Sequence, residues 1–314
     1  QRRLASSTYA LLRSMQRRCE KLDQLMESIR TGEITQEELK ARDRKLESLP
    51  DVYDEKTADE EDSEGGMEEN ERVADEAMGS FVATSLADLK IEREKVTQLI
   101  ELAENVYALG EESKFDKLRA VLADPNYRGQ KFIIFSEHRD TMSFIVRRFE
   151  GLGYTGKIAQ IHGGMNYRER DEHVAFFRTP TEEGGAQFLV ATDAAGEGIN
   201  LQFCWLMVNY DIPWNPARLE QRMGRIHRYG QKHDPVIIIN LVAGKTREGR
   251  VLKTLLDKLE IIRKELGKDK VFDVIGRILE GVSIRDYMER AMTDAGAEEA
   301  AKAIAGQLNS DHVT

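Results

Sequence analysis

Residues 187–201 read QFLVATDAAGEGINL, and they run from a short apolar strand into a loop that contains two glycines. Four further apolar strands are predicted, at residues 131–136, 157–161, 206–210 and 236–241. Helical patterns lie between them, at residues 141–151, 167–178 and 216–229. Near-continuous apolar strands that alternate with helices indicate a parallel sheet covered on both faces. We therefore predict an α/β fold with a mostly parallel sheet.

Helical periodicity dominates both ends of the chain. We assign residues 1–109 to protruding helices around an acidic segment at about 51–79, which is typical of a disordered linker or a poorly ordered loop. Residues 110–265 are assigned to the α/β lobe, and residues 266–314 to a C-terminal helical extension. The chain begins with Gln1 rather than Met, so we expect it to be part of a longer protein.

The net charge of −10 argues at first against a nucleic-acid partner. Residues 51–78, however, hold 13 acidic and 2 basic side chains, so the rest of the chain is close to neutral and a binding face can be locally basic. Cys19 and Cys204 form neither a disulfide framework nor a metal-ligand pattern. No apolar run approaches the roughly 20 residues of a membrane helix. These features predict a cytoplasmic chain without a metal site or a membrane span.

Residues 221–231, QRMGRIHRYGQ, follow Asn215 and Pro216, a pair that is typical of a helix start. One face of a helix over 216–229 would carry Gln221, Gly224, Arg225 and Arg228. Such a face would be unfavourable in the core, because burial of an unpaired guanidinium has a large free-energy cost. It suits a polyanion, since the donors of arginine match phosphate oxygens in pairs. An exposed helix with scattered salt bridges is the alternative interpretation.

The spacing of this run resembles the arginine-finger motif of superfamily 2 helicases. Its Arg-Tyr-Gly-Gln ending resembles the Swi/Snf-type branch of DNA-translocating ATPases. The resemblance implies a RecA-like lobe in which Arg225 and Arg228 reach the γ-phosphate of ATP while Gln221 helps to fix that geometry. Such charge stabilisation contributes on the order of a thousandfold or more to phosphoryl transfer.

The loop within residues 187–201 resembles the fifth motif of the same family. The resemblance implies that Thr192 meets the DNA backbone and that Gly196, Glu197 and Gly198 lie at the nucleotide. A tight strand-to-helix turn would also need glycines, and this alternative stays open. Trp214 belongs to a segment that resembles the Swi/Snf branch, and either contact with DNA or packing under the motif helix would account for it.

Two other strand-end loops resemble family motifs that contact DNA. His162, Gly163 and Gly164 follow one strand, and the resemblance implies contact with the tracking strand, mainly through backbone amides. Ser136 and Arg139 follow another strand and could meet phosphate. The alternatives are a structural role for the histidine and helix capping by Asp140.

Gly244-Lys245-Thr246 looks like the end of a P-loop, but Ile239 stands where the first glycine is required. The resemblance therefore implies a second motor lobe, whose partner lobe supplies the P-loop and the Mg²⁺ ligands for ATP. The parent protein would be an ATP-dependent translocase on double-stranded DNA, of bacterial or archaeal type, and this chain alone would be inactive. The N-terminal helices could also hold a protein partner. A non-catalytic docking or regulatory module and an RNA helicase lobe are the competing functions.

Overall fold

The computed structural model describes residues 6–32, 86–110, 112–193, 199–213, 216–227, 231, 233 and 235–242. The chain divides into two compact units, with the main division between Glu112 and Ser113. The acidic segment at 51–79 and the C-terminal extension at 266–314 lie outside the described residues, as does the rest of the chain from residue 243 onward.

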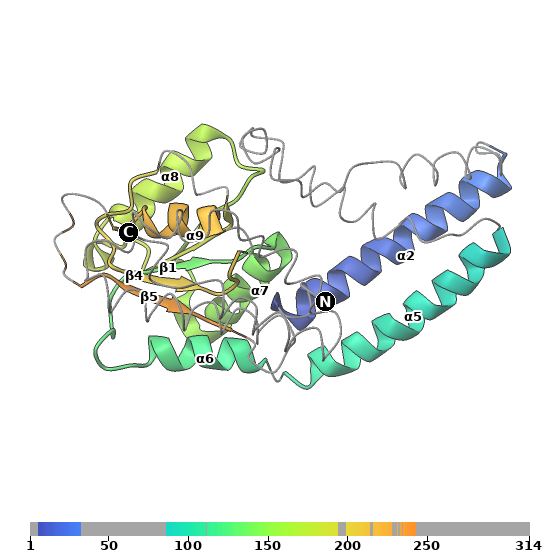
Figure 1. The fold of residues 1–314 in the computed structure, drawn as a ribbon, viewed down its shortest axis with the longest axis horizontal. Helices are drawn as coiled ribbons and strands as arrows, with labels where there is room; N and C mark the ends of the chain where they lie inside the picture. Colours follow the sequence, from blue (N-terminus) through green and yellow to red (C-terminus); the bar gives the residue numbers. More distant parts are fainter. Residues whose placement is uncertain are drawn as a thin grey trace, which may run out of the picture. The chain divides into compact units, whose positions relative to one another are not determined.

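The helical unit is a pair of long helices, α2 (Thr8–Arg30) and α5 (Leu86–Ala108), which lie side by side (Figure 1). Ser7 caps α2, because its hydroxyl accepts a hydrogen bond of 3.1 Å from the backbone N–H of Ala10. The two helices meet through a small apolar cluster that is centred on the buried side chains of Leu22 and Leu89. Ion pairs between Arg18 and Glu92 and between Asp23 and Arg93 also join them.

The second unit is built on a five-stranded sheet, in the order β2-β3-β1-β4-β5, in which every neighbouring pair is parallel. This confirms the predicted α/β class. The strands are β1 (Phe132–Phe135), β2 (Ile158–Ile161), β3 (Phe188–Ala191), β4 (Leu206–Asn209) and β5 (Ile237–Asn240). The main helices are α6 (Ser113–Leu122), α7 (Arg139–Phe149), α8 (Tyr167–Arg178) and α9 (Pro216–Met223). Short π and 3₁₀ helices follow α7 and α8, at Glu150–Tyr154 and Thr181–Glu183.

The central strands β3, β1 and β4 are buried on both faces of the sheet, since every residue in them is buried and alternate residues point to opposite sides. On one face Ile133 and Phe135 of β1 join a cluster with Phe177 of α8. On the other face Phe188 of β3 contacts Phe149 of α7, with ring centroids 4.7 Å apart. Figure 1 accordingly shows the sheet between α8 and α9 on one side and α6 and α7 on the other. This two-sided burial explains why β1 and β3 are apolar throughout.

The outer edge of β2 is partly closed by a side chain. The backbone N–H of Gln160 donates a hydrogen bond of 3.1 Å to Nδ1 of His173, which belongs to α8. β2 pairs with β3 on its other side, so the imidazole takes the place that a further strand would fill at this position.

Gly185 lies in a tight turn before β3, where the chain returns from α8. Its backbone N–H donates to the carbonyl of Pro180 at 3.0 Å, and a Cβ at this position would lie 1.9 Å from the carbonyl oxygen of Thr179. Only glycine fits here without movement of the backbone.

We expect Gly185→Ala to lower the free energy of unfolding by about 1–3 kcal/mol, the usual cost of overpacking. Urea denaturation followed by circular dichroism would measure it. Gly151→Ala is the matched control, because a Cβ there meets nothing within 4 Å, and it should be neutral or stabilising by up to about 1 kcal/mol. Equal stabilities of the two variants would contradict the close approach.

The thiol of Cys204 is enclosed in the core, where it donates to the carbonyl oxygens of Lys131 at 3.2 Å and Leu206 at 3.4 Å. Burial raises its pKa from 9.0 to about 12. The stability that this thiol contributes is therefore complete below pH 9 and is lost as the pH rises toward 12.

We expect Cys204 to stay unreactive in the folded protein at pH 8, because the thiolate is the reactive form. In a Cys19→Ser variant, Ellman's reagent should react only as fast as the chain unfolds, and urea should restore rapid reaction. Rapid labelling of this variant in native buffer would show that the thiol is accessible.

Candidate functional site

The loops that carry the predicted motifs leave the sheet at one edge, because parallel strands share a carboxyl end. Phe135 is in register with Ala191, which is in register with Ile161, so the next residues along each strand are neighbours. Ser136 donates its backbone N–H to the carbonyl of Ala191 at 2.9 Å, and Thr192 donates to Ile161 at 3.0 Å. The sheet therefore brings together the loops that begin at Ser136, His162 and Thr192. This edge is where open α/β sheets place their ligands.

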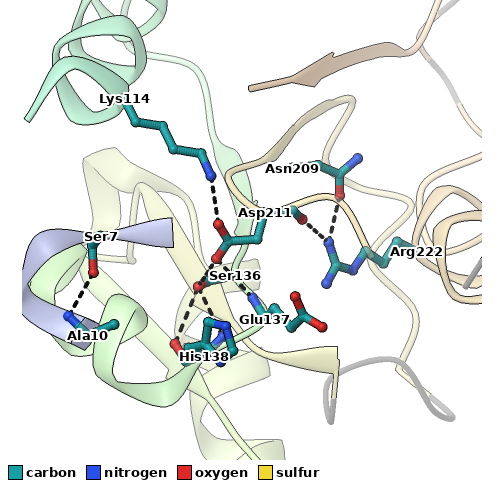
Figure 2. Close-up of polar contacts among 9 residues, drawn as sticks. All are labelled: Ser7, Ala10, Lys114, Ser136, Glu137, His138, Asn209, Asp211 and Arg222. Atoms are coloured by element: carbon teal, nitrogen blue, oxygen red, sulfur yellow. Dashed lines mark hydrogen bonds and ion pairs between the residues drawn. The ribbon is translucent and has the colours of Figure 1, made fainter. Parts of the chain in front are cut away.

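Asp211 connects three of the segments at this edge (Figure 2). Its carboxylate accepts from Nζ of Lys114 at 2.7 Å, from the hydroxyl of Ser136 at 2.7 Å and from the backbone N–H of Glu137 at 3.1 Å. Asp211 is buried, and so is Ser136. The hydroxyl that we expected to meet phosphate is thus held inside the lobe by a carboxylate, and the loop after β1 is tied to the end of β4.

Arg222, in the last turn of α9, is the largest fully buried side chain among the described residues, with 1% of its surface exposed. Its Nε donates to Oδ1 of Asp193. Its Nη1 donates to the backbone carbonyl of Asp211 at 2.6 Å and to Oδ1 of Asn209 at 3.2 Å (Figure 2). The guanidinium also lies over the ring of Phe135, 5.1 Å from its centroid. One side chain therefore contacts the ends of three strands.

The motif helix is shorter than predicted. α9 ends at Met223, and Gly224 and Arg225 lie in a turn whose backbone N–H groups reach back three residues, from Arg225 to Arg222 at 3.1 Å. The helical face predicted to carry Gln221, Gly224 and Arg225 is therefore interrupted after Gln221. Gln221 is exposed, whereas Arg225 is only 9% exposed and its Nε is buried.

The other predicted site residues differ in how far the structure describes them. His162 is half-buried, with Nδ1 inside the protein, whereas Gly164 and Arg139 are exposed and Thr192 is buried. α7 begins at Arg139, so Asp140 lies in its first turn and is not the N-cap, which removes the capping alternative. Outside the described residues are Gly196, Glu197, Gly198, Trp214 and Arg228.

Sequence analysis missed the two charged groups that organise this edge, Arg222 and Asp211. A signal was present in the sequence. Leu219, Arg222, Met223 and Ile226 follow helical spacing, and all are buried. An arginine in the apolar stripe of a helix indicates a paired, buried guanidinium, and a carboxylate directly after an apolar strand is a natural partner for one.

The described part of the chain contains no group of three or more His, Cys, Asp or Glu side chains that could hold a metal ion. None of its helices is both long enough and apolar enough to cross a membrane.

Residues 113–230 match the family described as the helicase conserved C-terminal domain. The uncharacterized ATP-dependent helicase YqhH of Bacillus subtilis (strain 168) is 44% identical over 138 residues, which cover 44% of this chain and 23% of that protein. The RNA polymerase-associated protein RapA of Vibrio vulnificus (strain YJ016) is 37% identical over 124 residues, which cover 38% of this chain and 12% of that protein. The chain spans less than a quarter of the length of these relatives.

Two solved structures are similar to the chain. The SWI2/SNF2 ATPase core domain of Sulfolobus solfataricus is 23% identical, with 47% of this chain and 29% of that chain covered and a TM-score of 0.33. The C-terminal part of the Fun30 ATPase domain is 16% identical, with 76% and 84% covered and a TM-score of 0.41. At these TM-scores the fold assignment rests on the sheet topology of the chain itself.

We expect Asp211→Ala to destabilise the lobe by about 3–5 kcal/mol, because it leaves Lys114 as an uncompensated, largely buried charge. Asp116→Ala is the matched control. It breaks an ion pair with Arg119 in which the side chain of Asp116 is 53% exposed and that of Arg119 is 59% exposed. Such an exposed pair contributes only about 0–1 kcal/mol. Urea denaturation of both variants measures the difference. If both variants lost a similar amount of unfolding free energy, Asp211 would not be the residue that organises the edge.

Proposed function

We propose that this chain is the second motor lobe of an ATP-dependent double-stranded DNA translocase. The match of residues 113–230 to the helicase conserved C-terminal domain, the similarity to an ATP-dependent helicase and the resemblance of residues 221–231 to the Swi/Snf branch support the proposal. The observation that carries the proposal is the anchoring of α9. Arg222 fixes the end of this helix to three strand ends, and the turn with Arg225 follows directly. The arginine motif is thus held at the edge of the sheet from which the other motif loops also leave.

In this proposal the two lobes hold ATP between them. The first lobe, outside this chain, binds the triphosphate and supplies the ligands for Mg²⁺. This chain supplies Arg225 and Arg228, which stabilise the charge that develops on the γ-phosphate, and Gln221 keeps their geometry. A guanidinium suits this role because it stays protonated at any physiological pH and presents donors in a fixed fork. Arg225 lies in a turn beyond the helix end, so its backbone can adjust when the lobes close without unwinding α9.

DNA would lie along the loops that begin at His162 and Thr192, with the nucleotide near Gly196, Glu197 and Gly198. Contacts through backbone amides of Gly163 and Gly164, and through Arg139 and Trp214, would be made to phosphate and sugar. Contacts with phosphate and sugar do not read the base sequence, so binding should not depend on sequence. Because they neutralise phosphate charge, binding should be strongly salt-dependent. The helical unit could in addition hold a protein, since α5 leaves Leu99, Leu102 and Val106 exposed.

Two other functions remain to be separated from this one by experiment. A non-catalytic docking module has no need of the arginine run, which the chain retains in full. An RNA helicase lobe would carry the same run, and the Arg-Tyr-Gly-Gln ending favours DNA only by resemblance.

We expect Arg225→Ala in the full-length protein to lower kcat for ATP hydrolysis by about a thousandfold or more, with little change in ATP affinity. The reason is that a finger acts mainly on the transition state. Single-turnover hydrolysis and binding of a fluorescent ATP analogue would measure the two effects. Arg119→Ala, at an exposed position of α6, is the control. An equal loss of ATP affinity would contradict the assignment.

We expect duplex DNA to stimulate the ATPase of the full-length protein more than RNA does, and the present chain alone to show no measurable hydrolysis. Steady-state phosphate release with matched duplex DNA, RNA and no nucleic acid measures both. Preferential stimulation by RNA would favour the RNA helicase alternative, and no response to either would favour the docking module.

A further inference from the structure

Besides the row of side chains that faces α2, helix α5 carries a second apolar row. Leu89 and Val96 belong to the apolar cluster between the two helices, so they form the row toward α2. The second row, which we call the outer stripe, follows one side of the helix and is between 41% and 60% exposed, and it consists of Ile91, Leu99, Leu102 and Val106. Large exposed apolar side chains that lie together mark an interaction surface.

The helical unit has a small apolar core within its described residues. The cluster between α2 and α5 is centred on Leu22 and Leu89, and the other apolar side chains packed around it, among them Leu25 and Val96, are only partly buried. In helical bundles each helix buries apolar surface against more than one neighbour. A helical partner on the outer stripe would therefore add burial that a pair of helices cannot provide by itself.

We propose that the outer stripe binds the same stripe of a second copy of this chain. In this dimer the two α5 helices run antiparallel about a two-fold axis, and the two helical units together form a four-helix bundle. Association of this kind needs neither ATP nor DNA, so it can be tested independently of the proposed motor function.

The outer stripe is complementary to itself when its direction is reversed. With the two-fold axis beside Leu99, the two copies of this leucine lie next to each other, and Ile91 of one copy lies level with Val106 of the other. Leu102 then lies level with Lys95, whose methylene stem can cover the leucine while its ammonium group stays in water. Every apolar residue of the stripe thus meets an apolar side chain or an apolar stem of the second copy.

The charges of α5 favour the antiparallel direction. Its basic residues all precede residue 96, whereas residues 96–112 hold four glutamates and no lysine or arginine. Antiparallel pairing therefore brings Lys95 of each copy close to Glu101 of the other, because Glu101 directly precedes Leu102. Both charged side chains are exposed and available for this contact. Parallel pairing would instead place like charges side by side, and charges beside an apolar stripe select the orientation of paired helices in this way.

The first test is sedimentation equilibrium of the chain over a range of concentrations. A contact between two helices lies at the low end of protein interfaces, so we expect a Kd on the order of 10–100 µM. Leu99→Gln should raise this Kd by about tenfold or more, because each dimer buries the leucine twice. Leu152→Gln is the matched control. It makes the same change at a leucine of the lobe that is 44% exposed, against 46% for Leu99, and should leave the Kd unchanged.

The second test exchanges the charges that set the direction. Lys95→Glu and Glu101→Lys should each raise the Kd by about fivefold or more, since two contacts per dimer become repulsive. The double variant should associate like wild type. An equimolar mixture of the two single variants should do so as well, because every contact in the mixed dimer again joins opposite charges. Recovery on mixing requires that Lys95 and Glu101 come from different copies.

Three results would overturn the proposal. The first is a chain that stays monomeric well above the expected range of Kd, and the outer stripe would then belong to a different protein partner. The second is an equal Kd for Leu99→Gln and Leu152→Gln, after circular dichroism has shown that both variants keep their helices. The third is a double variant or a mixture that fails to recover association.

Discussion

The charge on Arg222 has to be neutralised inside the protein, and the architecture of the strand-end edge follows from that requirement. A guanidinium with 1% exposure is tolerable only when carboxylates and carbonyls surround it. Asp193, Asn209 and Asp211 meet the requirement from two segments on either side of β1, after β3 and at the end of β4. The same need explains a second pair, since the carboxylate of Asp211 is balanced by Lys114. The edge is thus a small chain of alternating charges inside an apolar lobe.

This arrangement depends on the parallel sheet. Because all five strands run in one direction, their carboxyl ends meet and their loops can share side-chain partners. An antiparallel sheet would send alternate loops to opposite edges, and one arginine could not reach three strand ends. The lobe thus combines an apolar sheet with a polar edge at the carboxyl ends of its strands.

The sequence predicted the fold class well, for a physical reason. Fully apolar strands such as β1 and β3 are buried on both faces, and this pattern is hard to obtain in any other way. The predicted strand ends also placed the loops that begin at Ser136, His162 and Thr192 at one edge of the sheet. Side-chain detail was less accessible. Ser136 was expected to meet phosphate, but its hydroxyl is held by Asp211, a partner 75 residues away that no local pattern reveals.

The motif helix illustrates the same limit. Helical spacing placed Gln221 and Arg225 on one face, but spacing alone does not show that the helix ends at Met223 or that Arg222 is anchored in the core. A buried guanidinium is unfavourable when it has no partner, and this argument was used for the face with Arg225 and Arg228. Arg222 is buried because it is paired with Asp193. The burial of Arg222 depends on partners from other strands, and these partners can be identified only once the arrangement of the strands is known.

The contact of His173 with the edge of β2 has a consequence for how the lobe behaves in a crowded solution. An exposed strand edge can recruit a strand of another molecule and so begin aggregation. Here one backbone donor of that edge is already occupied by an imidazole nitrogen. Without this ring the donor would be free, and the sheet would be more open to association with its own copies.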